Sequence, residues 1–184
     1  MAFDAVSRKE YSADVSRFLI ELSQIDATKL SQPERIDYNI LFTKLESLKF
    51  DLDIWRAWEW NPLLVLDELY DGLFLVSEKP DLDMSLRVET AAIQLTQLPR
   101  ILDDAAQQLL YHSSLHKKQA GLVIEQLISL LEELPLKLNA DNLTLDDIDR
   151  KIENSILALE EYGDFLEVNI SQKERKIFPE DFPL

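Results

Sequence analysis

The chain has 184 residues, of which 46% are apolar, so it can bury a core and wholesale disorder is excluded. Its formal net charge is −16, and phosphate backbones and anionic membrane surfaces would repel it, so we expect no nucleic-acid and no membrane partner. With only three glycines and no cysteines, a loop-rich fold is disfavoured, and disulfides and thiolate metal sites are excluded.

The N-terminal residues lack the basic start and apolar run of a signal peptide. No stretch approaches the ~20 consecutive apolar residues that a membrane-spanning helix needs. We therefore expect a cytoplasmic protein.

Two helices are predicted in the first third of the chain. The first spans residues 7–25, where one apolar stripe recurs at steps of three and four: Tyr11, Val15, Phe18, Leu22 and Ile25. The second begins at a capping box formed by Ser31 and Glu34 and is expected to continue as far as Trp58 to Trp60. Its predicted buried face consists of Ile36, Ile40, Leu41, Leu45, Leu48, Leu52 and Trp55.

All three tryptophans lie in one segment, which we call the aromatic hub: Trp55, Trp58, Glu59, Trp60, Asn61 and Pro62. Asn is a favoured helix cap and Pro a favoured first helical residue, so a new helix is predicted over 62–76, apolar on most sides and central in the packing. The hub is interpreted as a packed helix junction, with Glu59 pointing outward or paired with Arg56. The alternative is an aromatic pocket in which Glu59 faces a cationic ligand.

The remaining residues predict three further helices. One spans residues 84–111, with a kink or break before Pro99 because proline removes a backbone hydrogen bond. Another covers 117–134, with Gly121 at a close helix approach and Pro135 at its end. The last begins at Thr144, and its apolar residues recur at close to seven-residue spacing: Ile148, Ile152, Ile156, Leu159, Tyr162 and Leu166.

Together these elements predict an all-α fold, an antiparallel bundle of six or seven helices in one domain over residues 1–170. One long helix would be kinked by proline. Residues 171–184 have no helical period and are expected to form an irregular tail or a severed connection to a further part.

His112 and His116 are the only histidines, four residues apart, a spacing that can place two zinc ligands on one helix face. A third ligand would have to come from elsewhere, such as Glu125. Two adjacent lysines disfavour a cation, so the pair is interpreted as exposed residues at a helix end and as weak metal candidates. No catalytic constellation is recognisable, and no cofactor is expected.

Four segments in order carry a resemblance to a known family: Leu30–Leu41, Trp58–Leu64, Leu98–Leu102 and Ala158–Leu166. Together they resemble the bacterial domain of unknown function 885, a helical group similar to zinc metallopeptidases. The resemblance implies a protein several times longer, whose His-Glu-x-x-His metal helix lies in its C-terminal part. This chain contains no such motif, so it resembles the N-terminal part only, and no catalytic position can be transferred.

The leading functional hypothesis is a non-catalytic helical scaffold, not an enzyme as the chain stands. Its partner would be the missing C-terminal catalytic-like part or another helical protein, with self-association as a further possibility. The alternative hypothesis is a stand-alone helical module that binds a protein or a peptide. A small metal enzyme using His112 and His116 is the weakest hypothesis.

Overall fold

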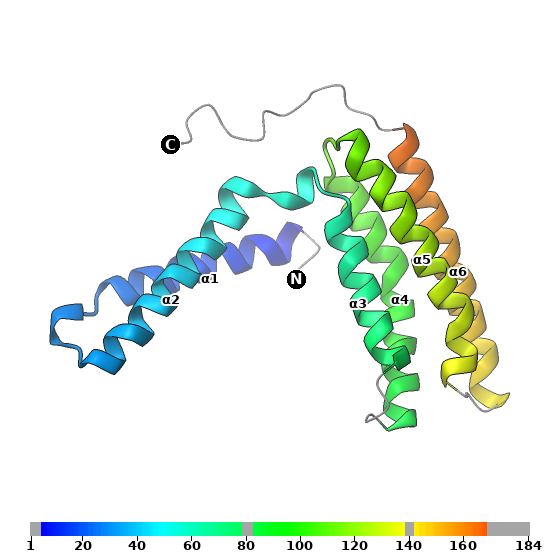
Figure 1. The fold of residues 1–184 in the computed structure, drawn as a ribbon, viewed down its shortest axis with the longest axis horizontal. Coiled ribbons are helices and arrows are strands. Elements are labelled where there is room, and N and C mark those ends of the chain that lie inside the picture. Colours follow the sequence, from blue (N-terminus) through cyan, green and yellow to red (C-terminus); the bar gives the residue numbers. More distant parts are fainter. Residues whose placement is uncertain (1–4, 79–82, 139–141, 169–184) are drawn as a thin grey trace. The chain divides into compact units, whose positions relative to one another are not determined.

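The computed structural model describes residues 5–78, 83–138 and 142–168 of the 184-residue chain. Within these ranges it contains six α-helices, short 3-10 and π turns, and no strand, which confirms the all-α prediction (Figure 1). The chain divides into two compact units, Met1–Ala57 and Trp58–Leu184, called here the N-terminal and C-terminal units. A single domain over residues 1–170 stays a prediction, and the predicted tail 171–184 lies outside the described residues.

The N-terminal unit is a pair of antiparallel helices, α1 (Ala5–Ser23) and α2 (Gln32–Phe50). A short 3-10 turn, Ala27–Lys29, lies between them, and a π turn, Asp51–Trp55, follows α2. The core of the pair consists of Val15, Leu22 and Leu45, and the partly buried side chains packed against it are Leu19, Tyr38, Phe42, Leu48 and Leu52.

Half of the apolar residues predicted to be buried in this unit are exposed, so that part of the prediction is wrong. The exposed set comprises Tyr11, Phe18, Ile25, Ile36, Ile40 and Leu41. Helical periodicity identifies which side of a helix is apolar, but two helices alone can cover only the seam between them. An apolar stripe wider than the seam therefore stays in contact with solvent.

The start of α2 is confirmed and its end is not. The Glu34 carboxylate accepts hydrogen bonds from the backbone N–H of Ser31 at 2.8 Å and from its hydroxyl at 2.7 Å. The helix ends at Phe50 instead of reaching Trp58, because the π turn leads to Arg56, which has a φ of 47°. A left-handed residue cannot continue a right-handed helix.

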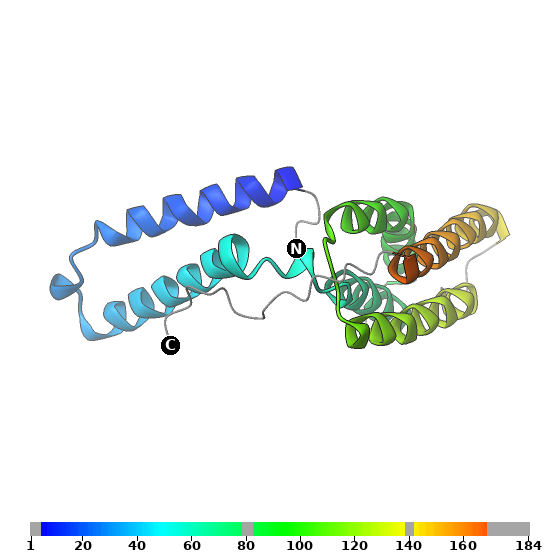
Figure 2. The same cartoon turned by 90° about the horizontal axis from the view of Figure 1, so that it is seen from above.

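The C-terminal unit is a four-helix bundle of α3 (Leu63–Glu78), α4 (Met84–Gln108), α5 (Ser114–Leu138) and α6 (Asn142–Val168) (Figure 1). Helices α3 and α6 each pack against both α4 and α5, so the chain crosses the diagonal of the bundle between α4 and α5 (Figure 2). Consecutive helices are antiparallel, and the side-by-side pairs α3 with α5 and α4 with α6 are consequently parallel.

Helix α3 does not occupy the predicted central position. It forms one corner of the bundle, and Phe74 and Leu75 on its outer side are 44% and 52% exposed. Its inner side is buried, with Leu66 and Leu73 almost completely covered. The apolar residues of this helix are therefore more than its two neighbours, α4 and α5, can cover.

Of the kink or break predicted before Pro99, the break is absent, since α4 continues through it to Gln108, and the kink stays a prediction. Proline has no N–H, so the carbonyl of Leu95, one turn earlier, loses its helical donor. The hydroxyl of Ser155 on α6 is completely buried and lies 3.3 Å from this carbonyl oxygen and 2.8 Å from that of Lys151. A donor from the neighbouring helix thus reaches the carbonyl that proline leaves unpaired.

Three smaller predictions about α5 and α6 are also wrong. Helix α5 continues past Pro135 because Leu134 and Leu138 on either side of it are completely buried in the bundle. Gly121 marks no close approach, since a Cβ built there would meet nothing within 4 Å. Helix α6 begins at Asn142, two residues before Thr144. Its predicted stripe is confirmed, with Ile148, Leu159 and Leu166 among its buried members.

Candidate functional site

The segment before α3 carries the C-terminal part of the aromatic hub. Ala57–Glu59 forms a 3-10 turn, and the side-chain oxygen of Asn61 accepts the backbone N–H of Leu63 at 3.1 Å. The predicted cap is therefore confirmed, with the helix starting one residue after Pro62. Trp58 and Trp60 are half-buried, whereas Trp55 belongs to the N-terminal unit, so the hub residues fall in two units.

The backbone of Glu59 connects this segment to the loop between α4 and α5. Its carbonyl oxygen accepts the backbone N–H of Leu110 at 2.8 Å and that of Tyr111 at 3.2 Å. The Glu59 residue is only 7% exposed, so of the two expectations for its side chain, outward or paired with Arg56, the first is wrong and the second stays a prediction. Two sites that the sequence suggested separately, the hub and the histidine pair, thereby lie together.

Trp60 and His116 contact each other across this junction. Their ring centroids are 5.5 Å apart and the ring planes are inclined by 38°. His116 lies in the first turn of α5, where its backbone N–H donates to the hydroxyl of Ser113 at 3.1 Å. The serine caps the helix and fixes the position from which the imidazole reaches the indole.

His112 lies in the loop just before α5 and is 7% exposed. Its Nδ1 atom is 3.4 Å from the carbonyl oxygen of Ser113. The Nε2 atom of His112 and the Nδ1 atom of His116 are both buried, and neither has a hydrogen-bond partner among the described residues. The predicted exposed pair is therefore wrong, and both imidazoles belong to a covered junction, which we call the imidazole–indole cluster (Trp60, His112 and His116).

The surroundings of His116 favour its neutral form. Burial, and then the nearby charge of His112, lowers the pKa of His116 below its ordinary value of 6.5. A buried imidazole that loses hydration without gaining an acidic partner is harder to protonate. Next to it, Lys117 is bound to Glu167 at 2.6 Å, so its charge is paired on the surface of the bundle.

The two imidazoles have no third metal ligand beside them in the described part of the chain. Among those residues, no group of three or more histidine or carboxylate side chains is arranged to hold a metal ion. Glu125, the suggested third ligand, is exposed on α5. Zinc sites use three or four protein ligands, so the cluster fits the packing of a helix junction better than metal binding.

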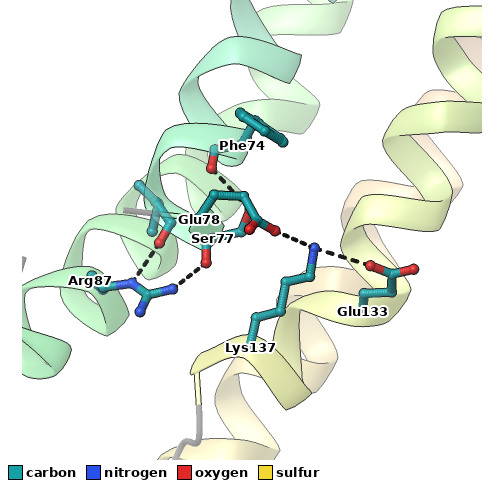
Figure 3. A network of polar contacts seen from close by, with 7 residues as sticks. Phe74, Ser77, Glu78, Arg87, Glu133 and Lys137 are labelled. Atoms are coloured by element: carbon teal, nitrogen blue, oxygen red, sulfur yellow. Dashed lines mark hydrogen bonds and ion pairs between the residues drawn. The ribbon is translucent and has the colours of Figure 1, made fainter. Parts of the chain in front are cut away.

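A second polar cluster, at the C-terminal end of α3, was missed from the sequence (Figure 3). The guanidinium of Arg87 on α4 is buried and donates from Nε to the carbonyl of Val76 at 2.7 Å, and from Nη2 to the carbonyl of Ser77. The ammonium of Lys137 on α5 binds Glu78 at 2.5 Å and Glu133 at 3.1 Å.

This helix-end cluster ties three helices together. The last carbonyls of a helix lack intrahelical donors and carry partial negative charge, so cations stabilise that end. One signal in the sequence could have revealed it: Arg87 is a lone charge in the stripe that continues with Ala91, Leu95 and Leu98. A charge in an apolar stripe must be paired when it is buried.

No family model and no curated protein matches the chain. Its fold is similar to that of a solved protein of unknown function from Shewanella oneidensis, provisionally described as a lipoprotein. The TM-score is 0.78 at 18% sequence identity, over 92% of this chain and 31% of that one. The chain thus spans about a third of the solved protein's length, and the likeness establishes the fold alone. Within the described ranges, no helix is both long and apolar enough to cross a membrane.

Proposed function

We propose that this chain is a non-catalytic helical scaffold that contributes one wall to a larger assembly. The observation that carries this proposal is the extent of the structural match: nearly all of this chain corresponds to less than a third of a longer protein. The polar clusters of the C-terminal unit support it, because their atoms hold helix ends and loops in place.

More specifically, we propose that the larger protein is metallopeptidase-like and that its catalytic half lies outside these 184 residues. The support is the ordered resemblance to the domain of unknown function 885. Its four segments occupy structural positions here: the start of α2, the start of α3, the buried part of α4 around Leu98, and α6 around Leu159. Segments that set helix starts and core contacts suit a wall better than a reaction centre.

Two measurements test this function. The coding sequence after Leu184, or the open reading frame directly downstream, should encode a helix with a His-Glu-x-x-His motif. The purified chain should contain no stoichiometric zinc by elemental analysis, and a chelator should leave its melting temperature unchanged. A metal that survives dialysis, together with a lower melting temperature in the presence of a chelator, would show that this chain carries its own metal site.

A second function, a helical module that binds a protein or a peptide, is favoured by one observation. The N-terminal unit exposes large apolar side chains on both of its helices, including Phe18 and Leu41. Contiguous apolar surface of this kind marks interaction sites on soluble proteins. A protein that stays monomeric with this surface uncovered, and binds an amphipathic helical peptide there saturably, would favour this second function.

A further inference from the structure

One face of the helix pair in the N-terminal unit carries apolar side chains along the middle of both helices. On α1, Tyr11 lies four residues before the buried Val15 and Phe18 lies three residues after it. On α2, Leu41 and Leu48 have the same offsets from the buried Leu45. At about 100° per residue, each offset turns the side chain by about 40–60° away from the line of contact between the two helices, and always in the same direction. Because α1 and α2 run antiparallel (Figure 2), rotations of the same sign bring both sets of side chains to one common face of the pair. We call Tyr11, Phe18, Leu41 and Leu48 the hairpin face.

The opposite face of the same helix pair is closed by polar contacts. The hydroxyl of Ser12 donates to Asp53 at 2.8 Å, and the ammonium of Lys49 donates to Ser16 at 3.0 Å and to Asp53 at 2.7 Å. Ser12 and Lys49 have the reverse offsets from the buried residues, three before Val15 and four after Leu45. The two faces of the pair therefore differ in chemistry: Leu19 and Phe42 on this face are partly buried against the core beside the polar contacts, whereas Tyr11, Phe18 and Leu41 on the hairpin face are exposed.

The helix pair is long enough to present a protein interface. Two adjacent 19-residue helices present a surface about 28 Å long and about 20 Å wide, on the order of 500 Å² in projection, and the hairpin face occupies the middle of it. A standard interface buries about 800 Å² of accessible surface per partner, so a contact along the whole pair would be of comparable order. Tyr11, Phe18 and Leu41 are 45%, 46% and 49% exposed, so the main side chains of the hairpin face have area left to bury.

The distribution of charge identifies the occupant. Residues 1–57 carry ten acidic and eight basic side chains, whereas residues 58–184 carry twenty-five and eleven. Two copies of this chain would therefore repel each other strongly through their C-terminal units and only weakly through their N-terminal units. An apolar face on the nearly neutral unit is the surface on which like copies can meet.

We propose that a second copy of this chain docks on the hairpin face, so that two helix pairs form a four-helix arrangement related by two-fold symmetry. Such a contact is isologous, with the same residues used by both copies. It buries the apolar side chains that two helices cannot cover, in the manner of a bundle core. This inference goes beyond the scaffold role and does not depend on it.

The first test measures the mass of the full chain in solution by light scattering and sedimentation from micromolar to near-millimolar concentration. A dimer is expected, and Phe18→Glu and Leu41→Glu should each raise its dissociation constant at least tenfold. The matched controls are Ile20→Glu and Ile36→Glu, at exposed residues on the sides of α1 and α2 that face away from the hairpin face. They should leave the dimer unchanged. A monomeric wild-type chain, or equal effects of all four variants, would overturn the proposal.

A second test does not depend on how a charged variant folds. The chain has no cysteine, so a single introduced thiol reports its own position. With a short bifunctional maleimide, Leu41→Cys should give a cross-linked dimer, and Ile36→Cys, nearly opposite on α2, should not. Preferential cross-linking of Ile36→Cys would place the contact elsewhere. Circular dichroism should confirm that both variants retain the helix content of the wild type.

Discussion

The two units of this protein differ in how much of the apolar side of each amphipathic helix is buried, because a helix has one neighbour in the first unit and at least two in the second. Among the described residues, the N-terminal pair has three buried core residues and the C-terminal bundle has twenty. In the bundle each helix meets two neighbours, so an apolar stripe of ordinary width is covered. In the pair each helix meets only one, and the outer part of its stripe remains exposed. The bundle therefore covers most of the apolar stripes of its own helices, whereas the pair leaves a larger part of its stripes exposed.

The largest expected effect compares the two cores directly. Leu131→Ala, at a completely buried residue of the bundle, should lower the free energy of unfolding by about 3–4 kcal/mol. Leu45→Ala, at the 8% exposed core residue of the pair, should cost about 2 kcal/mol because solvent and neighbours can fill part of the space. Chemical denaturation at one fixed protein concentration measures both. Equal losses would show that the two cores are equally well packed.

The next effect compares the polar contacts that close each unit. Arg87→Met leaves the carbonyls of Val76 and Ser77 without their charged donor and should cost about 2–3 kcal/mol. Lys49→Met removes a partly exposed contact with Asp53 and should cost less than about 1 kcal/mol. Hydrogen exchange should show faster opening at the end of α3 in the first variant. Retained protection there would mean that Arg87 is not needed to hold that helix end.

A smaller effect of opposite sign is expected at Gly121. This exposed residue lies in the interior of α5, and an added methyl group would have no neighbouring atom within 4 Å, so Gly121→Ala should stabilise the bundle by about 1 kcal/mol. Gly72→Ala is the matched control, because its Cβ would lie 3.2 Å from the Gln94 amide nitrogen, and its gain should be smaller. Since all three glycines lie in the C-terminal unit, Gly121→Ala should raise the melting temperature of the bundle and leave the stability of the helix pair unchanged. A lower melting temperature would show that the space around residue 121 is not open.

The smallest effect concerns acid. Because burial and the charge of His112 lower the pKa of His116, the unfolded chain binds a proton more readily than the folded chain. The stability from the neutral imidazole is complete above pH 6.5 and is lost as the pH falls below that value. His116→Gln should flatten the slope of unfolding free energy between pH 7 and 5. The lowered pKa of Asp53, caused first by its bond from Lys49, acts only at lower pH. If the slope of unfolding free energy against pH is the same in the variant, His116 is not the cause of the pH dependence.

Local features of the fold could be predicted from the sequence, since they depend on neighbours within a few residues. The contact of Glu34 with Ser31, the cap by Asn61 and the buried stripe of α6 are all confirmed. Features that depend on distant residues could not. Pro135 was expected to end a helix and Pro99 to kink or break one, but both helices continue through their prolines within the packed bundle. At Pro99 the hydroxyl of Ser155 lies near the carbonyl that proline leaves unpaired.

The imidazole–indole cluster could not be predicted from the sequence for the same reason. His112 and His116 are covered by a segment some fifty residues earlier in the chain, which contains Glu59 and Trp60. Neither segment signals the other by spacing or composition. On α1 and α2, periodicity gave the correct apolar side but carried no information on how many neighbours each helix has.

The carbonyl of Glu59 accepts hydrogen bonds from two backbone N–H groups of the stretch leading into α5. Main-chain atoms make this joint, so it does not depend on which side chains residues 110 and 111 carry, provided that neither is proline. Substitutions in that stretch can therefore change its surface without detaching it from the segment before α3.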